Sequence, residues 1–353
     1  MDQEKIYRQV EARLGRLHLS SLHRGFHLFP FALYDDARAW TAGGAIDKPD
    51  SFLGNTAVYH NGAWTAIWRL TDEAPDPDIL TSKIVHEMLH AFQNASGEKR
   101  WADEQDALLS YRRDPVNISA RLKEAALMRE CLTGEAPGAF DRLLGLRAAR
   151  KAHFPYEYGY EARIEQIEGT AHYVELAALE HLAPEKARAR WDEVLAAVND
   201  VEQNFQVRAV SYLTGAALIA CVKKYTPFDT DLPGPVPFAE AILEGAEPCP
   251  MPDTDPRVEA CLEKKRDDIL KVIEETLDKN DVALEGDQLL TAWNVYDAVR
   301  EGPYAVITHF LGYLGGTEKA DTDEELFRRM KIIHGDFVVR LTDGLRFDRA
   351  WRR

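Results

Sequence analysis

Residues 82–97, SKIVHEMLHAFQNASG, place two histidines four positions apart in a segment whose apolar residues follow a helical period. The segment ends at Gly97, a typical helix stop. On a helix, His86 and His90 project from one face and can converge on a single metal ion. We therefore predict a helix here that provides two metal ligands. The alternative is a pair of core or surface histidines that hydrogen-bond to other groups.

Glu87 completes the pattern H-E-x-x-H. It cannot be a third ligand from the face that carries His86 and His90, but its neighbouring position suits a general base that takes a proton from a metal-activated water. A catalytic zinc needs three protein ligands and an open fourth position. The third ligand must therefore come from elsewhere in the chain.

The segment EARIEQIEGTAHYVELAALEHL, which begins at Glu161, offers the strongest third ligand. On a helical wheel its apolar residues form one core stripe, made of Ile164, Ile167, Ala171, Val174 and Ala178. Glu168 and Glu175 lie at the border of this stripe, and Glu165 points further out. We predict Glu168 as the ligand, with Glu165, Glu175 and Glu104 as alternatives. The alternative is a solvated acidic face made of Glu161, Glu165, Glu168, His172 and Glu175.

Gly169 lies in the middle of the same predicted helix. Glycine costs about 1 kcal/mol relative to alanine in a helix interior. That cost is tolerable where another helix must approach closely, so we expect a helix crossing at this point.

HEMLHAFQ followed by IEGTAHYVE resembles the gluzincin branch of zinc metallopeptidases. That family has H-E-x-x-H on one helix and a zinc-binding glutamate on a later helix, often as E-G-x-A. The resemblance covers mainly residues 55–225 and rests on two short motifs. It implies one Zn²⁺ per chain held by His86, His90 and Glu168, Glu87 as general base, and a zincin-like fold with a small antiparallel sheet over the cleft.

Two features depart from the thermolysin-like pattern. The interval between His90 and Glu168 is long, with room for about three helices, and His172 stands where that family has an aspartate. An imidazole at this position could still orient His86 or His90, although it is a weaker acceptor than a carboxylate.

Two further features bear on catalysis and substrate binding. Tyr212, close to Gly215 in a predicted helix, is our candidate donor to the oxyanion of a tetrahedral intermediate. Its rivals are Tyr160, His172 and Tyr173, and it could equally be a half-buried core tyrosine. Asn61-Gly62 predicts a hairpin within residues 55–70, whose strands could hold an extended peptide. The face that carries Trp64 and Trp68 is expected to belong to the core.

The order of elements predicts a predominantly helical α+β fold. The spacing of apolar residues predicts an amphipathic helix over residues 1–20. The same kind of pattern predicts helices over most of residues 83–225. Residues 226–256 hold eight of the 17 prolines. They are either a semi-rigid connector or an ordered loop packed on one domain. We expect a metallopeptidase domain over 1–225 and a smaller accessory C-terminal α+β domain over 257–353.

Charge and composition limit the classes of molecule that the chain is expected to bind. The 353 residues carry a net charge of −16, which disfavours nucleic acid as the main partner. No apolar run is long enough for a membrane span. The charged N-terminus lacks the apolar stretch of a secretory signal, so we expect a cytoplasmic protein. The four cysteines are expected to be free thiols, with a Cys249–Cys261 disulfide as the alternative.

These features together predict a zinc metallopeptidase that hydrolyses peptide or protein substrates; the oligomeric state is not predicted. One alternative is a non-catalytic, zinc-stabilised interaction protein whose site is closed by a fourth ligand from Glu165, His172 or Glu175. Another is a zinc hydrolase that cleaves a non-peptide amide or ester.

Overall fold

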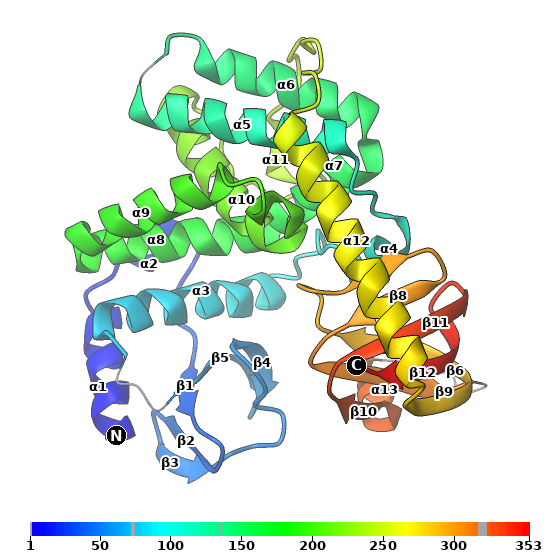
Figure 1. Ribbon diagram of the computed structural model, residues 1–353. Coiled ribbons are helices and arrows are strands. Elements are labelled where there is room, and N and C mark those ends of the chain that lie inside the picture. Colours follow the sequence, from blue (N-terminus) through cyan, green and yellow to red (C-terminus); the bar gives the residue numbers. More distant parts are fainter. Residues whose placement is uncertain (1, 72–74, 135, 317–322) are drawn as a thin grey trace.

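A computed structural model describes residues 2–71, 75–134, 136–316 and 323–353 of the chain. The chain has an α+β fold with an N-terminal sheet, a helical body and a small C-terminal sheet domain (Figure 1). This confirms the predicted fold class.

The N-terminal sheet has the strand order β3-β2-β1-β5-β4. Its strands are β1 (Phe31–Tyr34), β2 (Arg38–Thr41), β3 (Gly44–Asp47), β4 (Thr56–His60) and β5 (Ala63–Arg69). β4 and β5 form the predicted hairpin, because Asn61 and Gly62 both adopt positive φ, at 48° and 84°. This is the backbone that a tight Asn-Gly turn requires.

The expected small antiparallel sheet is mixed, because one of its four strand pairs is parallel. β1 pairs in parallel with β5, with Phe31 opposite Ala66 and Tyr34 opposite Arg69. Parallel strands need a long connection, and here β2, β3 and β4 lie between them in the chain. The hydrophobic period of short strands does not specify the direction in which they pair.

The helical body begins with α3, which carries the H-E-x-x-H motif. Asp76 caps its first turn by accepting hydrogen bonds from the backbone of Asp78 and Ile79, and Pro77 occupies the first position. Two helices precede the N-terminal sheet, α1 (Gln3–Leu14) and α2 (Leu19–Leu22). The helices of the body are α3 (Pro77–Ala95), α4 (Glu104–Ser110), α5 (Pro115–Thr133), α6 (Ala139–His153), α7 (Pro155–Ile164), α8 (Thr170–Leu182), α9 (Pro184–Val198) and α10 (Val207–Tyr225).

Helix α3 is buried between the N-terminal sheet and α8 (Figure 1). Its apolar residues share one core with α1, the sheet and α8, including Ile84 and Val85 from α3 and Val174 from α8. A helix that is apolar on most of its surface must lie inside a protein. The H-E-x-x-H motif is therefore held on a buried helix.

Helices α7 and α8 are one continuous helix interrupted by a π-helical turn, η1 (Glu165–Gly169). The turn brings Gly169 against Gly215 of α10, and a Cβ on Gly215 would lie 2.7 Å from the Gly169 Cα. The predicted close helix crossing at Gly169 is confirmed. Only a pair of glycines allows the two backbones to approach this closely.

The proline-rich segment 226–256 packs on the helical body. It contains α11 (Phe238–Ala241), and Phe238, Ala239 and Leu243 are buried in a core shared with α5, α6, α7 and α10. The Phe238 backbone N–H donates to Gln166 Oε1 at 2.8 Å. The segment is thus an ordered loop along this stretch.

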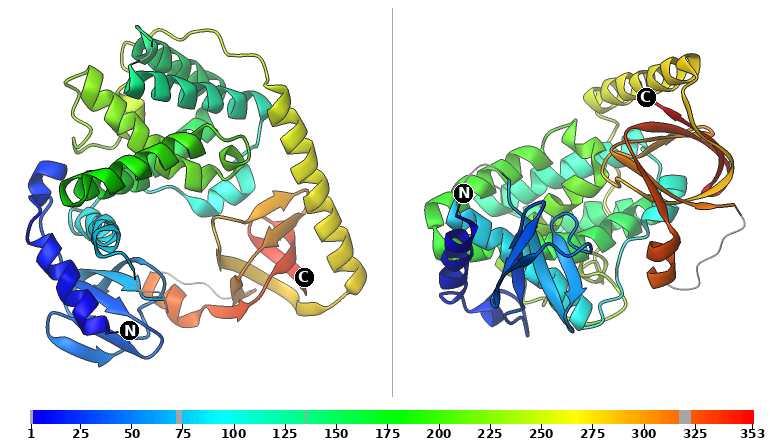
Figure 2. Two further views of the ribbon diagram at one scale, coloured as in Figure 1. Left: turned by 60° about the vertical axis from the view of Figure 1, so that its left-hand side comes forward. Right: turned by 90° about the horizontal axis from the view of Figure 1, so that it is seen from below.

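The C-terminal sheet has the strand order β10-β9-β6-β12-β11-β8-β7, with antiparallel neighbours throughout. Figure 2 shows it strongly curled. Its elements are β6 (Val282–Trp293), β7 (Val299–Glu301), β8 (Tyr304–Ile307), β9 (Phe310–Gly315), α13 (Asp323–Arg329), β10 (Lys331–His334), β11 (Phe337–Asp343) and β12 (Arg346–Arg352). The predicted domain boundaries at 225 and 256 stay predictions.

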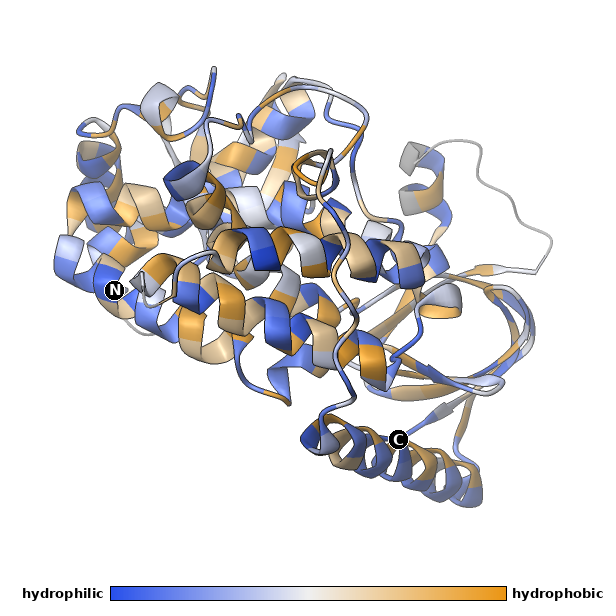
Figure 3. Cartoon of the chain, turned by 90° about the horizontal axis from the view of Figure 1, so that it is seen from above, coloured by the Kyte–Doolittle hydropathy of each residue, from blue (hydrophilic) through white to orange (hydrophobic). Residues whose placement is uncertain are grey.

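Helix α12 (Pro256–Lys279) runs from the helical body along the C-terminal sheet (Figure 2). Near its start, Val258 packs with Ile118 and Phe205, and near its end Ile273 packs with Val306 and Val338. Hydrophilic and hydrophobic bands alternate along it (Figure 3). An amphipathic helix of this kind can pack on both bodies through one face.

Two other expectations concern the whole chain. No helix in the described ranges combines the length and apolar character of a membrane span. All four cysteines are free, so the alternative disulfide between Cys249 and Cys261 is absent.

Replacing Gly215 with alanine should lower the free energy of unfolding by about 1–3 kcal/mol, because the new Cβ meets the backbone of Gly169 and Glu165. Gly159→Ala in α7 is the matched control, since no atom lies within 4 Å of its added Cβ. That change should be neutral or stabilising by up to about 1 kcal/mol. Urea denaturation of both variants tests the crossing, and equal stabilities would contradict it.

Candidate metal centre

Three predicted ligands come together where α3 faces η1. The Glu168 Oε2 atom lies 3.1 Å from His90 Nε2 and 3.8 Å from His86 Nε2. All three side chains are buried, and their ligand atoms lie within 4.8 Å of one another. Donors bound about 2.1 Å from a tetrahedral ion are roughly 3.4 Å apart. The cluster therefore has the spacing and the nitrogen and oxygen chemistry of a metal site.

Each histidine is oriented through its other ring nitrogen. His86 Nδ1 is hydrogen-bonded to Glu175 Oε2 at 3.1 Å, and His90 Nδ1 to Gln93 Oε1 at 2.8 Å. Gln93 in turn donates to the Ile167 carbonyl oxygen at 3.1 Å. These bonds direct both Nε2 atoms towards Glu168, as outer partners of metal-binding histidines commonly do.

The glutamates of the site act on the pKa of both imidazoles. Burial alone would lower the pKa of His86, but hydrogen bonds to Glu168 and Glu175 and the charge of Glu87 raise it to about 10. The pKa of His90 is also raised, because Glu168 outweighs burial. Burial would raise the pKa of Glu168, but the two imidazoles and Arg208 hold it well below its usual range. The site thus favours a bound cation.

Glu87 differs from the other carboxylates of the site. Its side chain is 7% exposed, and it makes no hydrogen bond or ion pair with any residue in the described ranges. Burial raises its pKa, while the neighbouring histidines lower it. A carboxylate with a raised pKa and free oxygens beside a metal site suits the acceptance of a proton.

The alternative third ligands have other partners. Glu104 accepts hydrogen bonds from Arg208 and from Tyr160. Glu175 lies on the Nδ1 side of His86, where it also contacts His172 Nδ1 at 3.4 Å. His172 thus contacts the carboxylate that orients His86, and its ring also lies edge-on to the His86 ring at 6.4 Å between centroids. Among the described residues, only Glu168 forms a possible ligand group with both His86 and His90.

Glu165 does not point outward as the helical wheel predicted. It is 2% exposed, and it accepts hydrogen bonds from Arg147 and from Thr214 Oγ1 at 2.9 Å. The wheel assumed a regular α-helix, whereas the π-helical turn adds a residue and rotates the rest of the helix by about 100°. A solvated acidic face is likewise excluded, because Glu161, Glu168 and Glu175 are also buried.

Tyr212 lies in the cleft beside the cluster, with its ring stacked on that of His86 at 6.5 Å between centroids. Its hydroxyl is 2.8 Å from the Tyr296 hydroxyl. Burial and the charge of Glu168 raise its pKa, which keeps the hydroxyl protonated. Of its rivals, Tyr160 is bound to Glu104 and Tyr173 packs between helices, where Lys223 lies over its ring.

The cleft over the cluster has a volume of about 500 Å³. One wall comes from Asn55, Thr56 and Ala57 at the outer strand β4, and another from Val295 and Tyr296 of the C-terminal domain. Trp64 also lines the cleft, whereas Trp68 packs on the core. The expectation that both tryptophans belong to the core therefore holds for Trp68 alone.

Four residues of this site were not predicted from the sequence. Gln93 and Arg208 carry a weak local signal, because Gln93 is three residues after His90 and Arg208 is four residues before Tyr212. Arg208 donates to Glu168 Oε1 at 2.8 Å. Trp101 and Tyr296 also line the cleft, and no local pattern indicates them because tertiary packing brings them there.

Comparisons with known proteins add no relative. No protein-family model matches the chain, and neither curated proteins nor solved structures give a match.

Glu175→Gln should weaken metal binding by the cluster about 10–100-fold, because the amide replaces the charged partner that orients His86. Competition with a chelator of known zinc affinity measures the change. Glu180→Gln is the matched control on the same helix, since Glu180 is exposed. An unchanged affinity in Glu175→Gln would contradict the orienting role.

Glu165→Ala should lower the free energy of unfolding by roughly 3 kcal/mol, because it removes a partner of the buried Arg147. Its folded form should bind metal as tightly as wild type, since Glu165 lies outside the cluster. Denaturant unfolding and metal analysis of the purified variant separate the two effects. Loss of zinc from a folded Glu165→Ala protein would restore Glu165 as a candidate ligand.

Proposed function

We propose that this chain is a zinc-dependent hydrolase of peptide bonds, of the gluzincin type that the sequence resembles. One observation carries the proposal. His86, His90 and Glu168 converge in a buried cluster, and the neighbouring Glu87 has a carboxylate without a partner among the described residues. Two histidines and a glutamate with an adjacent general base are a recurrent arrangement for metal-assisted hydrolysis.

The ligand set fits zinc. Imidazole nitrogens and a carboxylate oxygen are typical zinc ligands, and two histidines with one glutamate are a known catalytic set. When bound, zinc would act as a Lewis acid that polarises the scissile carbonyl group and makes a water molecule easier to deprotonate. Glu175 and Gln93 would hold the imidazoles in place, and Arg208 would hold the free oxygen of Glu168.

Glu87 would act as the general base. It would accept a proton from the attacking water and pass it to the leaving amine. Tyr212 would donate its hydroxyl hydrogen to the oxygen that gains negative charge in the transition state. Its position over the His86 ring and its protonated state support that role.

A peptide or protein substrate has a binding edge available. β4 is the outer strand of the N-terminal sheet, and Thr56 and Ala57 of this strand line the cleft. An extended peptide can add to such an edge through main-chain hydrogen bonds. This favours peptide hydrolysis over cleavage of a non-peptide amide or ester.

The position of the remaining candidates favours an open metal site. A closed, purely structural site would need a fourth ligand, for which the sequence offers Glu165, His172 or Glu175. Glu165 is paired with Arg147, and His172 and Glu175 lie on the Nδ1 side of His86. None of these three is in position to close the cluster.

Glu87→Gln should reduce kcat for peptide hydrolysis by roughly 10²–10⁴-fold, because the amide cannot accept the proton. The variant should keep about one zinc per chain, as Glu87 is outside the ligand set. A quenched peptide library with metal analysis on the same samples provides both readouts, and an ester panel tests the non-peptide alternative.

The outcomes separate the candidate functions. Glu168→Ala should lose zinc and activity together. Wild-type zinc binding without hydrolysis of any peptide or ester would favour the interaction protein. Full activity in Glu87→Gln would reject the general-base mechanism.

A further inference from the structure

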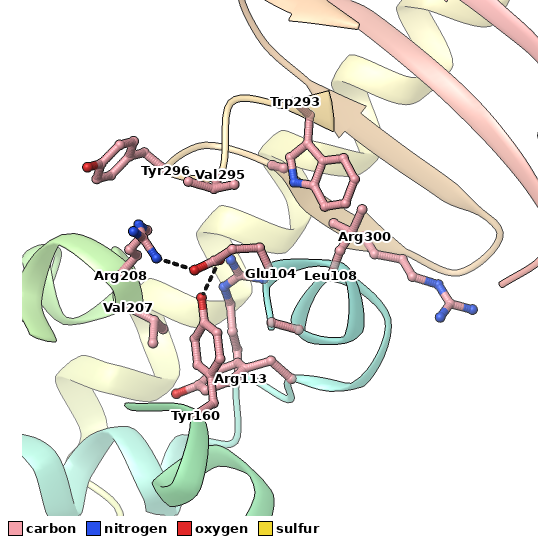
Figure 4. A pocket seen from close by; sticks show the side chains of 13 residues that line it. Glu104, Leu108, Arg113, Tyr160, Val207, Arg208, Trp293, Val295, Tyr296 and Arg300 are labelled. Carbon is pink, nitrogen blue, oxygen red and sulfur yellow. Dashed lines mark hydrogen bonds and ion pairs between the residues drawn. The ribbon is translucent and has the colours of Figure 1, made fainter. Parts of the chain in front are cut away.

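A second pocket, of about 70 Å³, lies beside the metal cleft where the helical body meets the C-terminal sheet (Figure 4). Residues of α4, α7 and α10 line one side of it. Trp293 at the end of β6, with Val295 and Tyr296 after it, lines the other. Arg208, Val295 and Tyr296 border both the pocket and the cleft.

Arg113 faces this pocket as a cation without a counter-charge. Its guanidinium makes no hydrogen bond or ion pair with any residue in the described ranges. Burial lowers its pKa, and only Tyr111 and Tyr160 act in the opposite direction. By contrast, the fully buried Arg147 and Arg150 each contact two carboxylates. Arg113 is only half-buried, and its guanidinium nitrogens still reach water. They are therefore free to donate to a ligand that replaces this water in the pocket.

Trp293 provides a second donor without an acceptor. Its side chain is 7% exposed, and its indole N–H has no hydrogen bond within the described part of the chain. Figure 4 shows the ring projecting from the end of β6 towards the helical body. The indole N–H is not sealed from water, so it can donate to a ligand that enters the pocket. Two independent donors from separate elements therefore face one small space.

The acceptors around the pocket are already in use. Glu104 receives hydrogen bonds from Arg208 and Tyr160, and the Tyr111 hydroxyl donates to Glu161 Oε1 at 2.6 Å. Arg300 donates to the carbonyl oxygens of Gly302 and Leu109, and its guanidinium points away from the pocket in Figure 4. The free groups are thus donors only, one of them charged.

We propose that this pocket binds a small oxyanion, a carboxylate or phosphate group, through Arg113 and the Trp293 indole N–H. Guanidinium groups match the paired oxygens of both anions. The volume suits one such group in place of a few water molecules. The site uses none of the three proposed metal ligands. Anion binding can therefore be tested independently of the proposed zinc peptidase activity.

Isothermal titration calorimetry of the full chain tests the site, with sodium phosphate and sodium acetate as separate probes at constant ionic strength. One anion should bind at one site with a Kd on the order of 1 mM or tighter. The stronger of the two probes identifies phosphate or carboxylate as the ligand group. The titration is run on metal-free and zinc-loaded protein, and binding should occur in both.

Arg113→Gln should weaken anion binding about tenfold or more, and Trp293→Phe several-fold, because each loses donors to the anion. Arg112→Gln is the matched control, since Arg112 is exposed and does not line the pocket. Without the anion, Arg113→Gln should be at least as thermally stable as wild type, because it removes an unpaired charge from a partly buried position. This readout distinguishes anion binding from a purely structural role.

Three results would overturn the proposal. They are no heat of binding with either anion, equal affinity in wild type and Arg113→Gln, and binding that Arg112→Gln weakens as much as Arg113→Gln does. If Arg113→Gln fails to fold, the anion affinity of Trp293→Phe tests the proposal. An unchanged affinity in that variant rejects the site.

Discussion

The buried glutamates of one continuous helix determine how the helical body is organised. A buried carboxylate is costly unless a positive group or hydrogen-bond donors face it. In α7, Glu161 is matched by Arg121 and Arg150, and Glu165 at the start of η1 is matched by Arg147. Glu168 and Glu175, further along, are matched by the two histidines of α3. The first group gives a structural ion network, and the second gives a site suited to a metal ion.

The π-helical turn separates these two groups. At this turn the Glu165 side chain points to Arg147, whereas the Glu168 side chain, three residues later, points to the histidines of α3. The contact between Gly169 and Gly215 at the same turn lets α10 approach. Arg208 and Tyr212, from the same helix α10, then reach the cleft. One local departure from α-helical geometry thus positions a ligand, its arginine partner and the proposed oxyanion donor. π-turns are often found at functional sites.

Local patterns in the sequence were enough to predict the H-E-x-x-H helix, the Asn61-Gly62 hairpin and the close approach at Gly169. Each of these depends on residues near one another in the chain, where side-chain spacing and backbone preference decide the outcome. Glu168 could be proposed for the same reason, from its place beside an apolar stripe.

The rest depends on long-range packing. A helical wheel assumes a constant rotation per residue, so it placed Glu165 on the wrong side of a helix that contains a π-turn. The parallel pairing of β1 with β5 depends on how the sheet is assembled, which short strands do not encode. Tyr296 and Trp293 reach their pockets only because α12 and the contacts of α4 fix the C-terminal sheet against the helical body.

The C-terminal sheet therefore completes two sites on the helical body. Tyr296 meets Tyr212 at the metal cleft, and Trp293 faces the pocket of Arg113. Between the two sites, Arg208 is held by Glu168 on one side and Glu104 on the other. Because both of its carboxylate partners make further contacts, Arg208 would keep the proposed metal cluster apart from the proposed anion pocket. Opposite charge preferences can then lie side by side in a chain of net charge −16.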